Sequence, residues 1–218
     1  NKIIQFICPD QTGIISKITS LLYKTKNNIL SIEQHVDSQN NNFYIRVVTN
    51  SDNYENFPNK ELNKLSQELN GKINIFNSNK KINVAILGTK ESEPIYDLFI
   101  KHASNSLPCN IPILISNHKE ISYIAKQFDT SFYKINSNDE LLKILKNQGI
   151  DLIILARYMQ IIPKNILKIF KNNIINIHHG FLPAFKGRSP YRQAWERGVK
   201  MIGATAHYVT ADLDEGPI

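Results

Sequence analysis

The stretch Ile174-Ile-Asn-Ile-His-His-Gly-Phe-Leu-Pro183 starts with two apolar residues and then becomes polar. A short apolar run of this kind is typical of a buried strand, and α/β proteins bind ligands at the carboxyl ends of such strands. Asn176 and His178 are separated by one residue, so a strand that continues through them places both side chains on the same face. The stretch therefore predicts an α/β sheet with a polar site at its edge.

The residues around this stretch alternate between short apolar runs and helical patterns, which favours a mostly parallel α/β sheet. Ser137-Asn-Asp-Glu140 has the sequence of a capping box at a helix start, and Gly149 is placed to end that helix. The expected strands are 82–87, 111–115, 132–135, 151–155 and 204–209, and the expected helices are 94–103, 119–128, 141–147 and one that starts at Pro163.

The first 76 residues have a different order, βαββαβ, which is that of a ferredoxin-like unit. Its expected strands are 2–8, 29–36, 43–48 and 73–76. The first helix is expected to bury one face, made of Ile14, Ile15, Ile18, Leu21 and Leu22. The second helix contains Leu62, Leu65 and Leu69 and is expected to end with Gly71 at its C′ position. The polar segment 77–81 is the predicted linker, which gives an N-terminal domain 1–79 and a second domain 80–218.

The composition is that of an ordinary globular protein, with 42% hydrophobic and 21% charged residues. No apolar run reaches the roughly 18 residues of a membrane span, and no signal-peptide pattern opens the chain, so we expect a cytoplasmic protein that does not enter a membrane. The net charge is +7, but the lysines are spread along the chain, so we expect no nucleic-acid partner.

The two cysteines, Cys8 and Cys109, are too few for a disulfide framework, and the histidines lack the spacing of a metal site, so we expect no metal. The chain starts at Asn1 without Met and stops at Ile218 directly after a predicted site loop. We therefore expect it to be a fragment of a longer protein.

Asn176, His178 and Asp214 are the candidate catalytic residues. Asp214 lies in the turn-forming segment Leu213-Asp-Glu-Gly-Pro217, which follows the last expected strand. Asn offers an amide donor, His can give or take a proton near neutral pH, and Asp could orient or polarise that His, so the three side chains have three distinct roles. Each residue also has a structural alternative, namely a turn cap, a buried satisfied histidine and a turn aspartate. The choice of base between His178 and Asp214 stays open.

Three segments, 156–163, 176–209 and 213–218, resemble the formyltetrahydrofolate transferase and hydrolase fold. The segment 8–37 resembles an ACT domain, an amino-acid-sensing module, and the two together resemble the formyltetrahydrofolate deformylase family. The resemblance implies a Rossmann-like catalytic domain after the ACT domain. It also implies a hydrolase that converts 10-formyltetrahydrofolate into tetrahydrofolate and formate, and so supplies formate for purine synthesis.

By this resemblance Asn176, His178 and Asp214 act on the formyl group. The implied substrate-binding residues, some around a slot for the pterin ring, are Arg157, Met159, Ile161, Ile162, His207, Thr210, Ala211 and Asp212. Met159 and Ile162 could instead fill the core, and His207 could have a structural role.

The implied effector pocket of the ACT domain consists of Asp10, Gly13, Asn28 and Ile29. Alternatively, Asp10 caps the first helix and Gly13 only eases the turn. The implied partners are the folate substrate, an amino-acid effector and further copies of the chain in a dimer or tetramer. No cofactor is implied, because 10-formyltetrahydrofolate is a substrate.

The loop after the first strand of the second domain helps to distinguish a hydrolase from a formyltransferase. A glycinamide ribonucleotide transferase has a glycine-rich phosphate loop there, whereas this chain has Gly88-Thr-Lys-Glu-Ser-Glu-Pro94, with one glycine and two glutamates. Such a segment is a poor phosphate cradle, which favours water as the acceptor. The alternatives are a formyltransferase that acts on glycinamide ribonucleotide or initiator tRNA, and a non-catalytic sensor of folate or amino acids.

Overall fold

The computed structural model describes residues 1–50 and 57–218, which form two compact units, Asn1–Lys80 and Lys81–Ile218. The division lies one residue beyond the boundary expected from the linker composition. Each unit has its own hydrophobic core.

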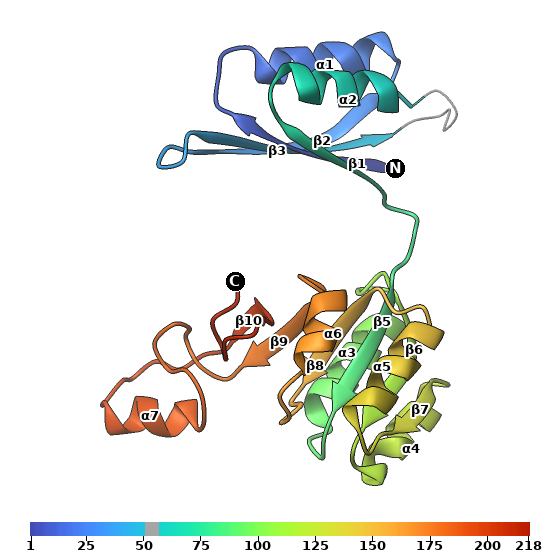
Figure 1. Ribbon diagram of the computed structural model, residues 1–218, viewed down its shortest axis with the longest axis vertical. Helices are drawn as coiled ribbons and strands as arrows, with labels where there is room; N and C mark the ends of the chain where they lie inside the picture. Colours follow the sequence, from blue (N-terminus) through green and yellow to red (C-terminus); the bar gives the residue numbers. More distant parts are fainter. Residues whose placement is uncertain (51–56) are drawn as a thin grey trace. The chain divides into compact units, whose positions relative to one another are not determined.

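The first unit is a four-stranded antiparallel sheet with the strand order β2-β3-β1-β4. Two helices cover one of its faces, as Figure 1 shows. The observed order of elements is the βαββαβ order expected of a ferredoxin-like unit. The elements are β1 (Lys2–Pro9), α1 (Ile14–Lys24), β2 (Asn28–Asp37), β3 (Asn42–Asn50), α2 (Asn59–Glu68) and β4 (Lys72–Asn77).

Alternating residues of the central strands form the core of this unit, including Ile4 and Phe6 of β1 and Ile45 of β3. Ile14, Ile18 and Leu22 of α1 pack against them at a spacing of four residues. The prediction that Ile15 is buried is wrong, because its side chain is 42% exposed. Its position next to Ile14 turns it roughly 100° around the helix, away from the buried stripe.

The end of α2 also differs from the prediction. Asn70, with φ 51°, adopts the left-handed conformation after the C-cap Leu69, so the C′ residue is Asn70 and not Gly71. Gly71 is needed for another reason, since a Cβ atom there would lie 2.7 Å from the carbonyl oxygen of Ile7. The chain passes too close to β1 at this point for any side chain.

The second unit is a six-stranded sheet with the order β10-β9-β8-β5-β6-β7. Five strands are parallel and β10 is antiparallel to β9, which confirms the mostly parallel α/β sheet. The strands are β5 (Asn83–Gly88), β6 (Asn110–Ser116), β7 (Ser131–Lys134), β8 (Leu152–Ala156), β9 (Ile174–His178) and β10 (Thr205–Tyr208). The helices are α3 (Glu93–Ala103), η2 (Lys119–Ile121), α4 (Ser122–Gln127), α5 (Asn138–Asn147), α6 (Lys164–Ile169) and α7 (Pro190–Glu196), the last of which the sequence pattern did not indicate.

Both faces of this sheet are buried, which explains why its strands are continuously apolar. Ala85 and Leu87 of β5 belong to a core with α5 and α6, whereas Val84 and Ile86 belong to a core with α3 and α4. Figure 1 shows helices on both sides of the sheet. This layering leaves the carboxyl edge of the strands free for a site.

The predicted capping box at the start of α5 is present in a slightly shifted form. The Ser137 hydroxyl accepts a hydrogen bond from Glu140 N at 3.2 Å, and the Glu140 carboxylate accepts one from Asn136 N at 2.9 Å. Gly149, with φ 57°, follows the end of the helix as expected.

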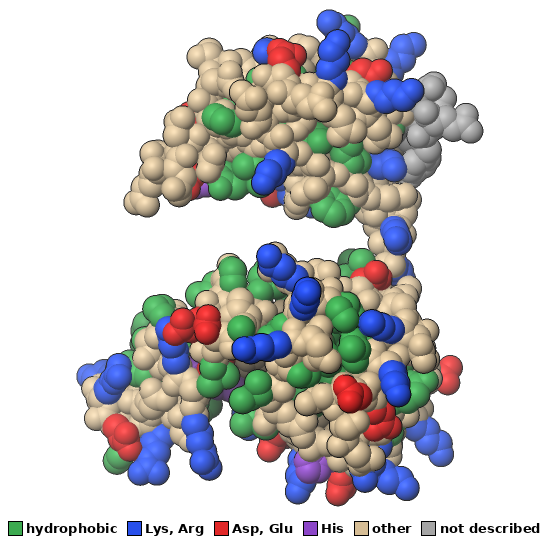
Figure 2. Space-filling model, in the orientation of Figure 1, with side chains coloured by type: hydrophobic (Ala, Val, Ile, Leu, Met, Phe, Trp, Pro, Cys, Tyr) green, Lys and Arg blue, Asp and Glu red, His purple; other side chains and the backbone are tan. Residues whose placement is uncertain are grey.

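Within residues 1–50 and 57–218, no helix has the length and apolar character that crossing a membrane requires. On the face that Figure 2 shows, Lys and Arg side chains are scattered over both units.

Candidate functional site

A cavity of about 810 Å³ lies at the carboxyl edge of the second unit, bounded by the residues that follow β8, β9 and β10. Every catalytic and substrate-binding residue expected from the sequence lines it. These are Arg157, Met159, Ile161, Ile162, Asn176, His178, His207, Thr210, Ala211, Asp212 and Asp214.

Asn176 and His178 come from β9, which continues through both residues as the spacing predicted. The antiparallel strand β10 places His207 opposite Asn176, and the Asn176 Nδ2 and His207 Nε2 atoms are 3.3 Å apart. Asn176 therefore contacts a site residue and does not cap a turn. His207 belongs to the same cluster, which its strand context alone did not reveal.

Asp214 lies between two imidazoles. Its Oδ2 atom is 3.3 Å from His178 Nδ1, and its Oδ1 atom is 3.6 Å from His207 Nε2. The backbone N–H of Gly187 donates a hydrogen bond of 2.9 Å to Asp214 Oδ2. The three side chains are buried, so their electrostatic interactions are much less screened than at the surface.

The second ring nitrogen of His178 faces an acceptor too. Its Nε2 atom contacts the carbonyl oxygen of Phe185, so this nitrogen carries a hydrogen and donates it. Its Nδ1 atom lies 3.3 Å from Asp214 Oδ2, so the imidazole and the carboxylate are close enough to exchange a proton. His178 and Asp214 thus form one proton-holding pair, supported by a loop whose residues the sequence analysis did not select.

The segment that carries Asp214 folds back onto β10. Tyr208 N donates to Pro217 O at 2.8 Å, and a Cβ atom on Gly216 would overlap the carbonyl oxygen of Tyr208. The glycine in Leu213-Asp-Glu-Gly-Pro217 is therefore what permits this close approach, and the approach sets the position of Asp214.

The apolar wall of the cavity combines buried and exposed side chains. Met159 and Ile161 are 75% and 84% exposed, so the alternative that Met159 fills the core is wrong. Ile162 lines the cavity but also packs in the core beside Tyr158. Burial raises the pKa of the Tyr158 hydroxyl.

Arg157 occupies a constrained position at the end of β8. Its φ is 55°, and its carbonyl oxygen accepts a hydrogen bond of 2.8 Å from the hydroxyl of Thr89, which follows β5. Its Nη1 atom is 3.1 Å from His179 Nε2, and the Tyr191 hydroxyl is 3.5 Å from His179 Nδ1. Burial, followed by the charges of Arg157 and His178, lowers the pKa of His179. The only sequence signal for His179 was its place beside His178.

The four positions expected to bind an effector lie in the first unit. Gly13, with φ 88°, is the N-cap of α1, and no side chain caps this helix, so the alternative that Asp10 is its cap is wrong. Asp10, Gly13 and Asn28 are exposed, whereas Ile29 is partly buried against the core of the unit.

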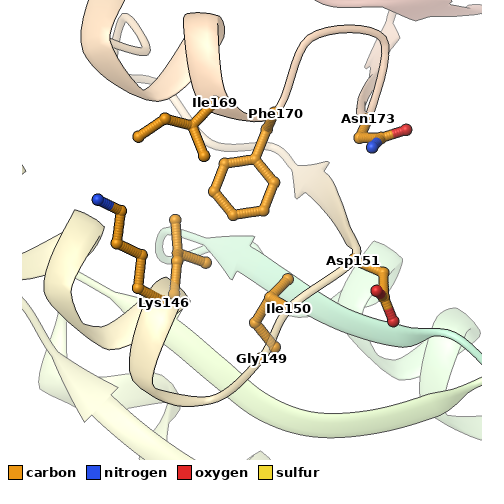
Figure 3. A pocket seen from close by; sticks show the side chains of 8 residues that line it. Lys146, Gly149, Ile150, Asp151, Ile169, Phe170 and Asn173 are labelled. Atoms are coloured by element: carbon orange, nitrogen blue, oxygen red, sulfur yellow. The ribbon is translucent and has the colours of Figure 1, made fainter.

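A smaller hollow of about 310 Å³ lies near the amino end of β8, between the end of α5 and α6 (Figure 3). Its carboxylate, Asp151, already accepts a hydrogen bond of 2.8 Å from Asn83 N. The described residues contain no group of three or more His, Cys, Asp or Glu side chains arranged to hold a metal ion. The cluster of catalytic residue types is at the opposite edge of the sheet.

Comparison with known proteins agrees with this geometry. Residues 16–218 match the formyl transferase family. The chain is 40% identical over 223 residues to the formyltetrahydrofolate deformylase of Synechocystis sp., which covers 97% of this chain and 78% of that protein. It is 37% identical to the Escherichia coli formyltetrahydrofolate deformylase, with 100% of this chain and 80% of that protein covered. A crystal structure of a formyltetrahydrofolate deformylase from Pseudomonas syringae is 32% identical with a TM-score of 0.92, covering 100% of this chain and 76% of that one. This chain belongs to the formyltetrahydrofolate deformylase family.

Proposed function

We propose that the protein hydrolyses 10-formyltetrahydrofolate to tetrahydrofolate and formate. The observation that carries this proposal is the convergence of Asn176 and His178 with Asp214, which is distant from them in sequence, on one cavity beside an apolar wall. Its relatives that are named formyltetrahydrofolate deformylases support the same activity.

Asn176 polarises the formyl group. One N–H of its amide donates toward His207 Nε2, which leaves the second N–H for the formyl oxygen. As water attacks the formyl carbon, that oxygen becomes negatively charged, and a single positioned donor can stabilise this charge by roughly 3 kcal/mol. The carbon becomes tetrahedral and keeps its bond to the folate nitrogen at this stage.

The His178–Asp214 pair moves the proton. The attacking water loses a proton to the pair, and the pair returns a proton to the folate nitrogen as the carbon–nitrogen bond breaks. The products are tetrahydrofolate with an N–H group and formic acid, which ionises to formate and a proton. The 3.3 Å distance between Nδ1 and Oδ2 supports a role for the pair as one acid–base unit.

The apolar wall suits the flat pterin ring. Met159, Ile161 and Ile162 supply aliphatic surface, and Thr210 to Asp212 form the loop on the other side of the cavity. The Thr210 hydroxyl donates to Asp212 O at 3.1 Å, which stiffens that loop. We propose that these residues hold the ring while the formyl group lies toward Asn176.

Water is the proposed acceptor of the formyl group. Thr89, in the loop after β5, donates its hydroxyl to the carbonyl oxygen of Arg157 and is buried. This loop therefore stabilises the backbone of Arg157, and its two glutamates would repel a phosphate group.

The test is an assay of the purified protein with 10-formyltetrahydrofolate, in which tetrahydrofolate and formate are both quantified. We expect equal amounts of the two products in buffer alone, and the same rate when glycinamide ribonucleotide is added. A protein that forms tetrahydrofolate only when an amine acceptor is present would be a transferase, and the proposal would be wrong.

For the first unit we propose an ACT-type regulatory domain that binds an amino acid, such as glycine or methionine, near Asp10, Gly13, Asn28 and Ile29. Its βαββαβ order and the open backbone at Gly13, where a Cβ atom would meet nothing within 4 Å, support this role. Titration calorimetry with each amino acid tests it, with Gly13→Val as the variant expected to lose binding. Absence of heat for every amino acid would contradict it.

We further propose that the enzyme acts in the cytoplasm as a dimer or tetramer and that its formate enters purine synthesis. Sedimentation of the purified protein tests the oligomeric state. A purine requirement in cells that lack the enzyme, relieved by added formate, tests the metabolic role.

A further inference from the structure

We propose that Arg157, His179 and Tyr191 form a carboxylate-binding site within the cavity and that its ligand is formate, the product of the reaction. This inference rests on the proposed hydrolysis, because formate is the anion that the reaction generates there. None of the three residues belongs to the Asn176, His178 and Asp214 set.

The backbone of Arg157 is held in place before any ligand arrives. Its carbonyl oxygen is fixed by the Thr89 hydroxyl at 2.8 Å, and its φ of 55° is a conformation that a non-glycine residue rarely adopts. Such strain persists only where surrounding contacts enforce it, and it concentrates at functional positions. The guanidinium is thereby directed to the space beside His179.

The charge of Arg157 has no counter-ion among the described residues. No carboxylate oxygen in 1–50 or 57–218 forms an ion pair with it, and its Nε atom is buried without a hydrogen-bond partner. A buried, unpaired N–H group on a cation is costly unless an acceptor satisfies it. An anion bound against the guanidinium would supply both the counter-ion and the acceptor for the Nε–H group.

His179 presents a hydrogen-bond donor on the same side. Because its Nε2 atom accepts from Arg157 Nη1, the ring hydrogen is on Nδ1, and the Tyr191 hydroxyl lies 3.5 Å from that nitrogen. The two rings pack edge to face at a centroid distance of 5.9 Å. The cluster therefore offers an N–H group, a hydroxyl and a guanidinium, which is a donor set for a carboxylate.

Formate is the anion that the proposed reaction would generate beside this position. His179 directly follows His178, and Arg157 directly follows β8, whose Leu155 pairs with Asn176. The three residues of the cluster also line the same cavity as Asn176 and His178, where the proposed carbon–oxygen bond forms. Formate released there is next to the negative charge of Asp214, and Arg157 is the neighbouring cation that attracts it away from that carboxylate.

The probe is sodium formate, added to the full chain without folate, with sodium chloride at equal ionic strength as the background. Binding is followed by the NMR signals of ¹⁵N-labelled histidine rings. We expect formate to shift the His179 ring signals in a saturable way, and Arg157→Gln to weaken this binding by about tenfold. Arg157→Lys keeps the charge but lacks the Nε–H group and the planar guanidinium. Its formate affinity should lie between those of the wild type and Arg157→Gln.

Arg192→Gln is the matched control. Arg192 lines the same cavity, but its Nε atom is already paired with Glu196 at 2.8 Å, so formate affinity should stay within about twofold of the wild type. If chloride produces the same shifts as formate, or if Arg192→Gln weakens binding as much as Arg157→Gln, the site does not exist as proposed.

A second source of carboxylate is the glutamate tail of the folate. Folic acid has this tail and pteroic acid lacks it, so each is tested as a competitor of formate. If the site holds formate, both ligands leave formate binding intact. If folic acid displaces formate and pteroic acid does not, the cluster binds the tail, and the assignment to formate is wrong.

The turnover assay separates this inference from the proposed function. Turnover without any formate-dependent shift of His179 overturns the site alone. Formate binding in a protein that does not hydrolyse 10-formyltetrahydrofolate overturns the proposed function, and with it the assignment of formate as a product at this site.

Discussion

The carboxylate of Asp214 has three neighbours, and each comes from a different part of the second unit. His178 is on β9, His207 is on β10, and the N–H of Gly187 belongs to the loop before α7. The Gly187 N–H donates a hydrogen bond to this buried carboxylate, and both imidazoles lie within 3.6 Å of it, so the group is held firmly in one position. The chemistry of the site therefore depends on individual atoms of this group more than on its overall charge.

Replacing Asp214 with Asn keeps the size of the side chain and removes the proton-holding pair with His178. We expect kcat to fall by about 10²- to 10⁴-fold, which is the usual contribution of a positioned acid–base group, while folate binding changes little. Formate release gives kcat, and titration calorimetry with folate gives the affinity.

Glu215→Gln is the control for this variant, because the neighbouring carboxylate is exposed and pairs with Lys186. Its kcat should stay near that of the wild type. Since His178 and Asp214 act as one unit, His178→Ala combined with Asp214→Asn should be no slower than the more damaging single variant. Additive losses would show that the two residues act separately.

The lowered pKa of His179 makes the folded protein less stable at acidic pH. Its pKa is lowered in the folded protein by burial, and then by the charges of Arg157 and His178, so the unfolded chain binds the proton more readily. The contribution of His179 to the unfolding free energy is therefore fully present above the ordinary histidine pKa of about 6.5, and it is lost as the pH falls below that value.

The measurement is urea unfolding of the wild type and of His179→Gln at about pH 7.5 and about pH 5.5. The wild type should lose more of its unfolding free energy on acidification than the variant does. The other histidines are common to both proteins and cancel in this comparison. An equal loss in the two proteins would mean that His179 does not titrate as inferred.

At the scale of single elements, the turn between Leu213 and Pro217 is the part of the fold on which the site depends most. It returns onto β10 so closely that Gly216 has no room for a side chain against the Tyr208 carbonyl. Gly216 permits the close approach that places Asp214, whereas Gly149 adopts the positive φ that follows the end of α5.

Gly216→Ala should therefore displace Asp214 and lower kcat by about tenfold or more, with little change in the circular dichroism spectrum. Gly149→Ala, at a positive φ with open space around it, should cost about 1 kcal/mol of stability and leave kcat unchanged. Formate release and thermal unfolding distinguish the two. A fully active Gly216→Ala enzyme would contradict this account of the turn.

At the scale of the whole chain, the separate cores of the two units predict separate unfolding. Leu22 is fully buried in the core of the first unit, so Leu22→Ala should destabilise that unit by about 2–5 kcal/mol. We expect calorimetry to show two transitions, of which only one moves in this variant, while hydrolysis at room temperature continues. A single transition that shifts as a whole would contradict independent cores.

The sequence predicted the elements well wherever a local pattern carried the information. The continuous apolar strands, the Ser137 cap and the spacing of Asn176 and His178 follow from short-range rules, and all are present. The errors at Ile15 and Gly71 arose where a neighbour in space decides, namely the orientation of α1 and the approach of β1.

The site was predicted only as far as its residue types and their spacing allowed. The pairing of Asn176 with His207 depends on β10 lying antiparallel to β9, and the pairing of Asp214 with Gly187 depends on two loops meeting. The contact of Arg157 with His179 likewise joins the ends of two strands. No local pattern contains these long-range contacts, so only the folded chain could reveal them.

In the proposed mechanism, water attacks a formyl group held by Asn176 and the His178–Asp214 pair. Hydrolysis of 10-formyltetrahydrofolate in ¹⁸O-labelled water, with the formate analysed by mass spectrometry, tests it most directly. We expect one labelled oxygen in each formate, at a rate that Asp214→Asn lowers sharply. Formate without label, or labelled formate produced equally fast by Asp214→Asn, would contradict it.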